Sequence, residues 1–193
     1  MLHQLGNFVA PKSNTDLPAS WIDDHNRLVS EVSDRYQQIG RTVRIEDENR
    51  VEIISKSGVK VVGQPDILVE EVLSGPEKSR GIIVEAKTGR QRSKDRLQVM
   101  LYMMMTNAAR SISGISNMPD GQLVYKDGTV LDIPFTEITD DFKKSVSRLL
   151  GIVALAEPPD PRPSGYCRFC KFLDICPSAE QEGHSIIDET DDF

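Results

Sequence analysis

The spacing of apolar positions changes several times along the chain, and each change predicts a new element. Apolar residues recur every three or four positions from Trp21 to Tyr36 and stop before Gly40, which predicts a first helix. Short runs rich in Val and Ile follow and predict strands. They cover residues 42–46, 51–55, 59–62, 67–72 and 81–86. Turn-forming residues at 47–50 and at Ser57-Gly58 separate the early runs.

The second half of the chain continues the alternation of helices and strands. It predicts a helix over 93–109, strands over 121–125 and 129–133, and a helix over 140–156. Leu97, Leu101 and Met105 recur at every fourth position in the first of these helices, and Asp127-Gly128 predicts a hairpin between the two strands. The order of elements predicts an α/β fold with a mixed central sheet flanked by helices.

The length and the charge refine this picture. A chain of 193 residues accommodates one domain and an appendage. The net charge of −7 argues at first against a partner rich in phosphate, but residues 179–193 hold six acidic and no basic residues. Without them, 23 basic residues stand against 24 acidic ones. We expect a lead-in over 1–17, a core over 18–157, a cysteine-rich segment over 158–178 and an acidic tail over 179–193, which can engage a basic protein partner.

No apolar run approaches the roughly 20 residues that a transmembrane helix needs. The N-terminus also lacks the charged and apolar regions of a secretory signal. We therefore expect a cytoplasmic protein without a membrane partner.

Candidate chemistry lies at the ends of two predicted strands. Asp66 follows Gly63-Gln-Pro65, and Glu85-Ala-Lys87 ends the strand that comes eighteen residues later. Two carboxylates and a lysine there are costly unless a cation compensates them, and Mg²⁺ and Mn²⁺ prefer carboxylate oxygens. Such an ion can activate water at a phosphate while Lys87 orients that water, so the pattern fits metal-dependent phosphodiester hydrolysis. The alternatives are that Asp66 is a turn residue after Pro65, and that Glu85 and Lys87 lie on the solvated face of an edge strand.

A further pair, Gln98 and Tyr102, is spaced by four residues and therefore shares one helix face. Together, Pro65-Asp66, Glu85-x-Lys87 and Gln98-x-x-x-Tyr102 resemble the PD-(D/E)xK nuclease superfamily, in particular its RecB-like branch. The resemblance implies a restriction-endonuclease-like fold and a nuclease acting on single-stranded DNA or DNA ends. It also implies that Gln98 and Tyr102 support the site and the DNA strand.

In the RecB-like branch, a histidine on an upstream helix is commonly a further metal ligand. By this resemblance His25 joins Asp66 and Glu85 as a ligand, and its imidazole suits manganese in particular. The alternative is a surface histidine.

A basic run follows the predicted metal site. It contains Arg90, Arg92, Lys94 and Arg96, with Asp95 as its one acid. Long cations here can hold the phosphates on either side of the cleaved bond, which gives salt-dependent binding without sequence preference. The alternative is a charged loop without a ligand.

All three cysteines lie in the motif Cys167-x2-Cys170-x5-Cys176, which suits zinc or an iron–sulfur cluster. The motif is similar to that of CRISPR-associated iron–sulfur exonucleases and AddB-type nuclease domains, where a fourth cysteine lies upstream. This chain has no other cysteine. The alternatives are that His3 replaces the missing ligand of a 4Fe-4S-like cluster, that His184 completes a zinc site of three cysteines and one histidine, or that the fourth position is open. We favour the cluster, in a structural role, because the spacing matches.

Our leading hypothesis is a Mg²⁺- or Mn²⁺-dependent DNA nuclease, with exonuclease action in DNA repair, recombination, phage or CRISPR context. The second hypothesis is a DNA-binding or assembly subunit that keeps the nuclease fold inside a larger complex. A restriction-type endonuclease of the same superfamily is a third.

The identity of the metal at the cysteines is directly testable. We expect protein purified without oxygen to be brown, because iron–sulfur clusters absorb visible light. A colourless preparation that contains stoichiometric zinc by metal analysis would reverse this preference.

Overall fold

The computed structural model describes residues 19–76, 78–109 and 114–155, together with Ser164, Cys167, Cys176 and Ser178. The expected lead-in (1–17) and acidic tail (179–193) lie outside the described residues, as do His3, His184 and Cys170. In the described part of the chain, no helix is both long enough and apolar enough to cross a bilayer.

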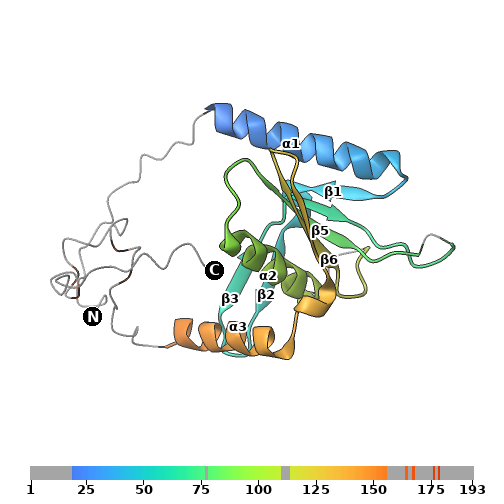
Figure 1. The fold of residues 1–193 in the computed structure, drawn as a ribbon. Coiled ribbons are helices and arrows are strands. Elements are labelled where there is room, and N and C mark those ends of the chain that lie inside the picture. The colour runs from blue at the N-terminus through green and yellow to red at the C-terminus, as the bar shows by residue number, and fades with distance from the viewer. Residues whose placement is uncertain are drawn as a thin grey trace.

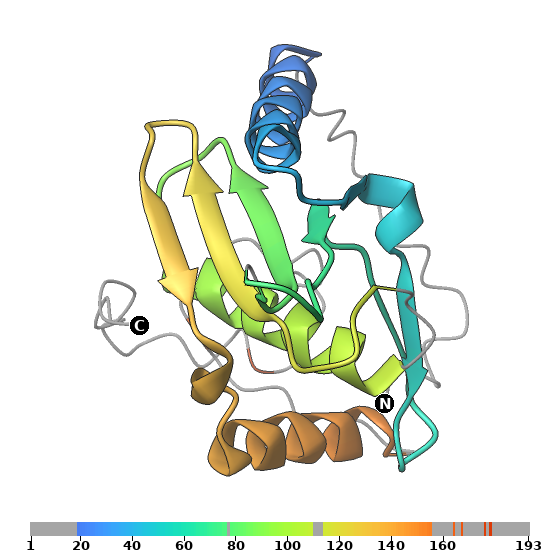
Figure 2. The same ribbon diagram turned by 90° about the vertical axis from the view of Figure 1, so that its right-hand side faces the viewer.

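A five-stranded mixed sheet forms the centre of the molecule. In spatial order it contains β1 (Val43–Ile45), β4 (Ile67–Val69), β5 (Ile82–Lys87), β6 (Asp120–Tyr125) and β7 (Val130–Ile133). Only β5 and β6 run parallel, and all other neighbours are antiparallel. The parallel pair needs a crossover, which α2 (Ser93–Ala109) provides. Figure 2 shows this sheet with its helices above and below. The predicted α/β class with a mixed sheet is thus confirmed, and it fits a restriction-endonuclease-like fold.

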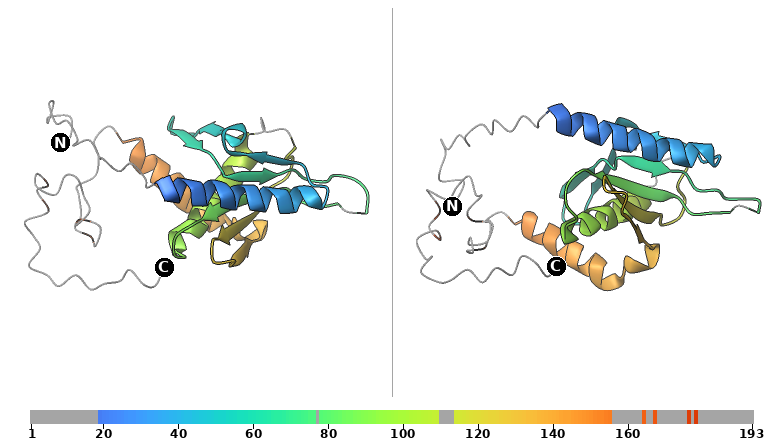
Figure 3. Two further views of the ribbon diagram at one scale, coloured as in Figure 1. Left: turned by 90° about the horizontal axis from the view of Figure 1, so that it is seen from above. Right: turned by 45° about the horizontal axis from the view of Figure 1, so that its top comes forward.

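The two long helices cover opposite faces of the sheet. Side chains alternate along each strand, so Ile67 and Val84 pack under α1 (Ala19–Gln38), whereas Leu68 and Ile83 pack against α2. Figures 1 and 3 show α1 lying along one face and α2 crossing the other. Burial on both faces explains why β4 and β5 are continuous apolar runs in the sequence.

Two of the predicted strands leave the main sheet, which the sequence did not indicate. β2 (Val51–Ile54) and β3 (Lys60–Gly63) form a separate antiparallel ribbon next to α2 (Figure 1). The 3-10 turn η2 (Glu46–Asn49) redirects the chain before β2. The buried Asn49 holds this turn, because its Nδ2 donates to the carbonyls of Arg44 at 3.0 Å and Pro65 at 3.2 Å.

The remaining elements follow the predictions, with differences at their ends. The strand expected at 67–72 ends at Val69, and the last helix, α3 (Asp140–Val153), ends three residues early. Before α3 lies η3 (Phe135–Glu137), and Thr139 caps α3 by accepting from the backbone N of Phe142. The core side of α2 is formed by Val99 and Met103, whereas Leu97, which marked the periodicity, is 55% exposed.

The close packing of α2 on β6 depends on Gly121. A Cβ at this position would lie 2.5 Å from Val99 Cγ1 and 2.7 Å from Met103 Sδ. We expect Gly121→Ala to lower the free energy of unfolding by about 1–3 kcal/mol because the helix must shift. Urea denaturation measures this effect. Gly151→Ala is the control, since nothing lies within 4 Å of its Cβ position; equal stability of the two variants would contradict the prediction.

Candidate active site

The strand register brings the two predicted carboxylates together. Ile67 pairs with Val84, and continuing this register by one position places Asp66 opposite Glu85. The Asp66 carboxylate is anchored to β5, because the backbone N of Ala86 donates to its Oδ2 at 2.8 Å. On the other side, the backbone N of Glu46 donates to the Asp66 carbonyl at 2.9 Å. Asp66 is therefore held between η2 and β5, with its second carboxylate oxygen left for another partner.

Lys87 and Gln98 form a hydrogen-bonded cluster with Glu85. Lys87 Nζ lies 2.9 Å from Glu85 Oε1 and 2.8 Å from Gln98 Oε1, and Gln98 Nε2 donates to the same Glu85 oxygen at 2.8 Å. Glu85 is 4% exposed, and its Oε2 is buried without a hydrogen-bond partner among the described residues. A buried carboxylate oxygen without a donor is costly, so this atom calls for a cation.

Tyr102 supports this cluster from the next turn of α2. Gln98 Nε2 lies 3.1 Å from Tyr102 OH, so one side of the helix carries both residues, as their spacing predicted. The tyrosine ring lies against Gly63, where a Cβ would come within 2.8 Å of Cε1. This role of Gly63 was not predicted from the sequence. The signal for it is a glycine at the end of a strand, two residues before Pro65, because glycine in a strand often marks a close approach of another group.

His25 reaches the site from α1. Its Nε2 lies 3.5 Å from Asp66 Oδ1. The indole of Trp21, one turn earlier, is parallel to the imidazole, with 4° between the planes and 5.5 Å between the ring centroids. The structure thus places the predicted helical histidine beside the first carboxylate, and it adds an aromatic neighbour that the sequence analysis used only as a helix marker.

The two carboxylates lie in an open cleft of about 400 Å³. Its wall includes Trp21, His25, Asp66, Glu85 and Lys87, and the loop residues Arg90, Arg92 and Lys94. Three of the four cations of the basic run therefore border the carboxylates. Arg96 does not line this cleft, because its guanidinium forms an ion pair with Glu137 on η3, with Nε 3.1 Å from Oε2.

Asp95 organises the basic loop, which the sequence analysis did not recognise. Its buried carboxylate accepts from the backbone N of Arg92 at 3.1 Å and from Tyr125 OH at 3.0 Å. Burial and this hydrogen bond raise the pKa of Tyr125 to about 12. The sequence signal for this role of Asp95 was an acidic residue in the first turn of a predicted helix.

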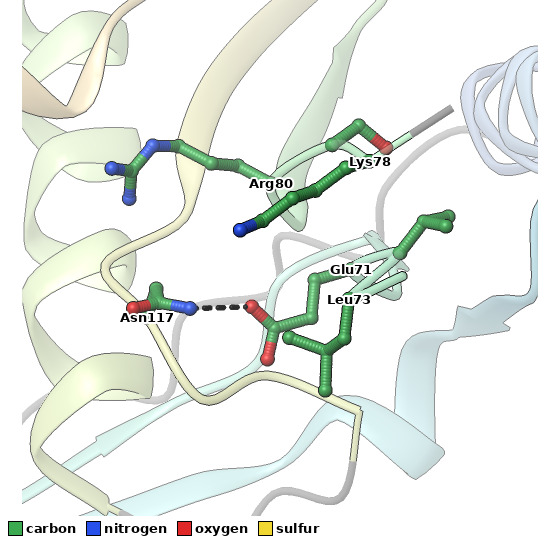
Figure 4. A pocket seen from close by; sticks show the side chains of 7 residues that line it. Glu71, Leu73, Lys78, Arg80 and Asn117 are labelled. Carbon is green, nitrogen blue, oxygen red and sulfur yellow. Dashed lines mark hydrogen bonds between the residues drawn. The ribbon is translucent and has the colours of Figure 1, made fainter. Parts of the chain in front are cut away.

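A second pocket, of about 330 Å³, lies near the opposite ends of β4 and β5 (Figure 4). Its Glu71 accepts from Asn117 Nδ2 at 3.0 Å, and its Arg80 guanidinium stacks on Phe135, 3.7 Å from the ring centroid. Glu71 and Arg80 are engaged in contacts that hold local loops, and Lys78 is the other charged residue of the lining, so we assign no catalytic role to this pocket.

Glu85 and His25 both have a raised pKa and hold their protons more strongly than usual. Burial and the charge of Asp66 raise the pKa of Glu85 to about 7, although Lys87 opposes this shift. The hydrogen bond with Asp66 raises the pKa of His25. Binding of a cation therefore competes with protons near neutral pH.

The donor set fits a hard divalent cation. Asp66 and Glu85 offer carboxylate oxygens, one of them without a partner, and His25 offers a nitrogen. No group of three or more potential ligands is close enough to hold an ion alone within the part of the chain that the structure describes. Magnesium suits such a partial set, because it keeps several waters and binds substrate phosphates.

Two carboxylates and a lysine at adjacent strand ends, beside an open cationic cleft, are an arrangement that suits metal-dependent hydrolysis. The family model of the PD-(D/E)XK nuclease superfamily matches residues 7–177. The chain therefore belongs to this superfamily, and membership indicates a nuclease that uses a divalent metal. A comparison with curated proteins found no match.

The pKa of Glu85 predicts a pH-dependent response to Mg²⁺. The ordinary pKa of Glu85 is 4.5, and its pKa in the folded chain is about 7. Between these two pH values Glu85 keeps its proton in the folded chain and loses it in the unfolded chain, so its contribution to the stability of the metal-free protein falls as pH rises. Mg²⁺ binds the ionised carboxylate. We therefore expect Mg²⁺ to raise Tm more at about pH 8 than at about pH 6. Thermal denaturation with and without Mg²⁺ at the two pH values measures this difference. Glu85→Gln, which cannot ionise, should lose most of this response; equal shifts at both pH values in the wild type would contradict it.

Proposed function

We propose that this chain is a DNA nuclease of the RecB-like branch that hydrolyses phosphodiester bonds in single-stranded DNA or at DNA ends, as an exonuclease. The observation that carries the proposal is the buried Glu85 Oε2, which has no hydrogen-bond partner in the described residues. It lies opposite Asp66 in a cleft lined by four cationic side chains. This combination provides a place for a cation and, next to it, a place for phosphates.

Asp66 and Glu85 would hold Mg²⁺ or Mn²⁺, and His25 would assist from α1 after losing its proton. The bound ion supplies Lewis acidity to the scissile phosphate and lowers the pKa of water. The hydrogen bond between Ala86 N and Asp66 Oδ2 fixes the orientation of one carboxylate before any ion binds. The contacts of Lys87 and Gln98 with Glu85 Oε1 fix the other.

Lys87 positions the nucleophile. Its ammonium has three N–H donors, and two are directed at Glu85 and Gln98. The third is available for the attacking water or a phosphate oxygen, where the positive charge also stabilises the charge that develops in the transition state. Gln98, held by Tyr102, keeps the ammonium in this place. In the reaction, the water oxygen bonds to phosphorus and the bond from phosphorus to the leaving sugar oxygen breaks.

Arg90, Arg92 and Lys94 bind the strand. Their place in the cleft allows contacts with phosphates beside the scissile one, and such contacts carry no sequence information. The hydrogen bond between Asp95 and Arg92 N keeps the loop against the body of the protein.

The cysteine motif belongs to the same proposal. Cys167 and Cys176 are both free thiols, and the backbone N of Ser164 donates to Cys167 Sγ at 3.2 Å. The family match extends to residue 177, past the third cysteine of the motif. We propose that Cys167, Cys170 and Cys176 hold a 4Fe-4S-like cluster, or alternatively zinc, that stabilises the segment, and that the acidic tail serves a protein partner in a repair, phage or CRISPR assembly.

The proposal predicts that Lys87→Ala abolishes Mg²⁺- or Mn²⁺-dependent cleavage, because the attacking water loses its donor. We expect a loss of activity of at least about a hundredfold on labelled linear single-stranded DNA. Lys144→Ala is the control, since this lysine is exposed on α3 and pairs with nearby Asp141. Comparing linear with circular strands separates exonuclease from endonuclease action.

Retained cleavage in Lys87→Ala protein would contradict the proposed mechanism. A wild-type chain that binds DNA but does not cut it with either metal would favour the second hypothesis, a DNA-binding or assembly subunit.

A further inference from the structure

The cleft contains an exposed aromatic side chain that the hydrolytic reaction does not use. Trp21 is the single tryptophan of the chain, and 40% of its surface is exposed on α1. Tryptophan usually buries most of its large ring. Here the ring lines the same cleft as Asp66 and Glu85, so the exposed tryptophan belongs to the candidate active site.

The orientation of Trp21 is set by its helix. The ring lies one turn of α1 before His25 and parallel to the imidazole, with 4° between the planes. His25 Nε2 lies 3.5 Å from Asp66 Oδ1, so the stacked imidazole links the indole to this carboxylate. A flat ring held at this angle offers a platform on the wall of the cleft.

The cleft that contains Trp21 also carries positive charge. Lys87, Arg90 and Lys94 line the same cleft and supply positive charge for a phosphate backbone. A stacking ring combined with a cationic groove is the arrangement by which proteins bind unpaired strands without reading their sequence. Bases inside a duplex are stacked on one another and offer no free face to such a ring.

We propose that Trp21 stacks on an unpaired base next to the scissile phosphate and thereby makes the cleft select single strands over duplex. The inference rests on the proposed nuclease function and adds a specificity-determining residue to it. Because the chain has one tryptophan, its fluorescence reports this contact directly.

The test uses the full chain carrying Lys87→Ala, so that no strand is cut, with Mg²⁺ present. Its fluorescence is titrated with oligothymidylate, with a blunt duplex of equal length, and with an abasic strand of equal length and charge. We expect oligothymidylate alone to quench Trp21 strongly.

In an anisotropy assay, Trp21→Ala should weaken binding of oligothymidylate about tenfold and leave binding of the abasic strand unchanged. Trp21→Phe should restore part of the loss.

Two controls separate stacking from a purely structural role. Ile22→Ala removes a neighbouring side chain of α1 that is 44% exposed and does not line the cleft, and it should bind every strand as the parent does. If Trp21 acted only by orienting His25, quenching would be the same with the abasic strand, and this result overturns the inference.

The inference and the proposed function fail in different ways. Equal binding of oligothymidylate by the parent and Trp21→Ala, together with wild-type cleavage that requires Lys87, overturns the stacking role alone. Base-dependent quenching without any cleavage by the wild type overturns the nuclease proposal and retains the platform.

Discussion

The rest of the site depends on the burial of the Glu85 carboxylate beside Asp66. Two negative groups at adjacent strand ends, one of them 4% exposed, raise the free energy of the fold unless donors and cations surround them. Lys87 and Gln98 satisfy one oxygen of Glu85, and the backbone of β5 satisfies one oxygen of Asp66. Glu85 Oε2 remains without a partner among the described residues, and in the proposed function a divalent cation supplies one, so the unfavourable electrostatics and the proposed chemistry have the same origin.

The sheet makes this burial possible. Because β4 and β5 are covered by α1 on one face and α2 on the other, helix side chains reach the strand ends from both directions, His25 from α1 and Gln98 from α2. A slip of the pairing between β4 and β5 by one residue would move Asp66 away from Glu85. The apolar runs that anchor this register are therefore as important to the site as the charged residues themselves.

Several features of the site were predictable from the chain alone, and others were not. The spacing of Gln98 and Tyr102 predicted a shared helix face because a helix has a fixed period. The motifs around Asp66 and Glu85 predicted that the two carboxylates lie together at strand ends, whereas the cation itself stays a prediction. The basic run was only partly predictable: Arg90, Arg92 and Lys94 border the cleft, but Arg96 pairs with Glu137, which lies 41 residues away in the sequence. No local pattern can reveal a partner at that separation.

The order of helices and strands, the candidate residues Asp66, Glu85 and Lys87, and membership in a nuclease superfamily follow from the amino-acid sequence, because they depend on periodicity and on residue type in a motif. Three other features became visible only in the folded chain: β2 and β3 form a separate ribbon, Gly63 accommodates the ring of Tyr102, and Trp21 lies exposed at the cleft. These features depend on contacts between residues far apart in the chain, and such contacts are set by packing rather than by local pattern.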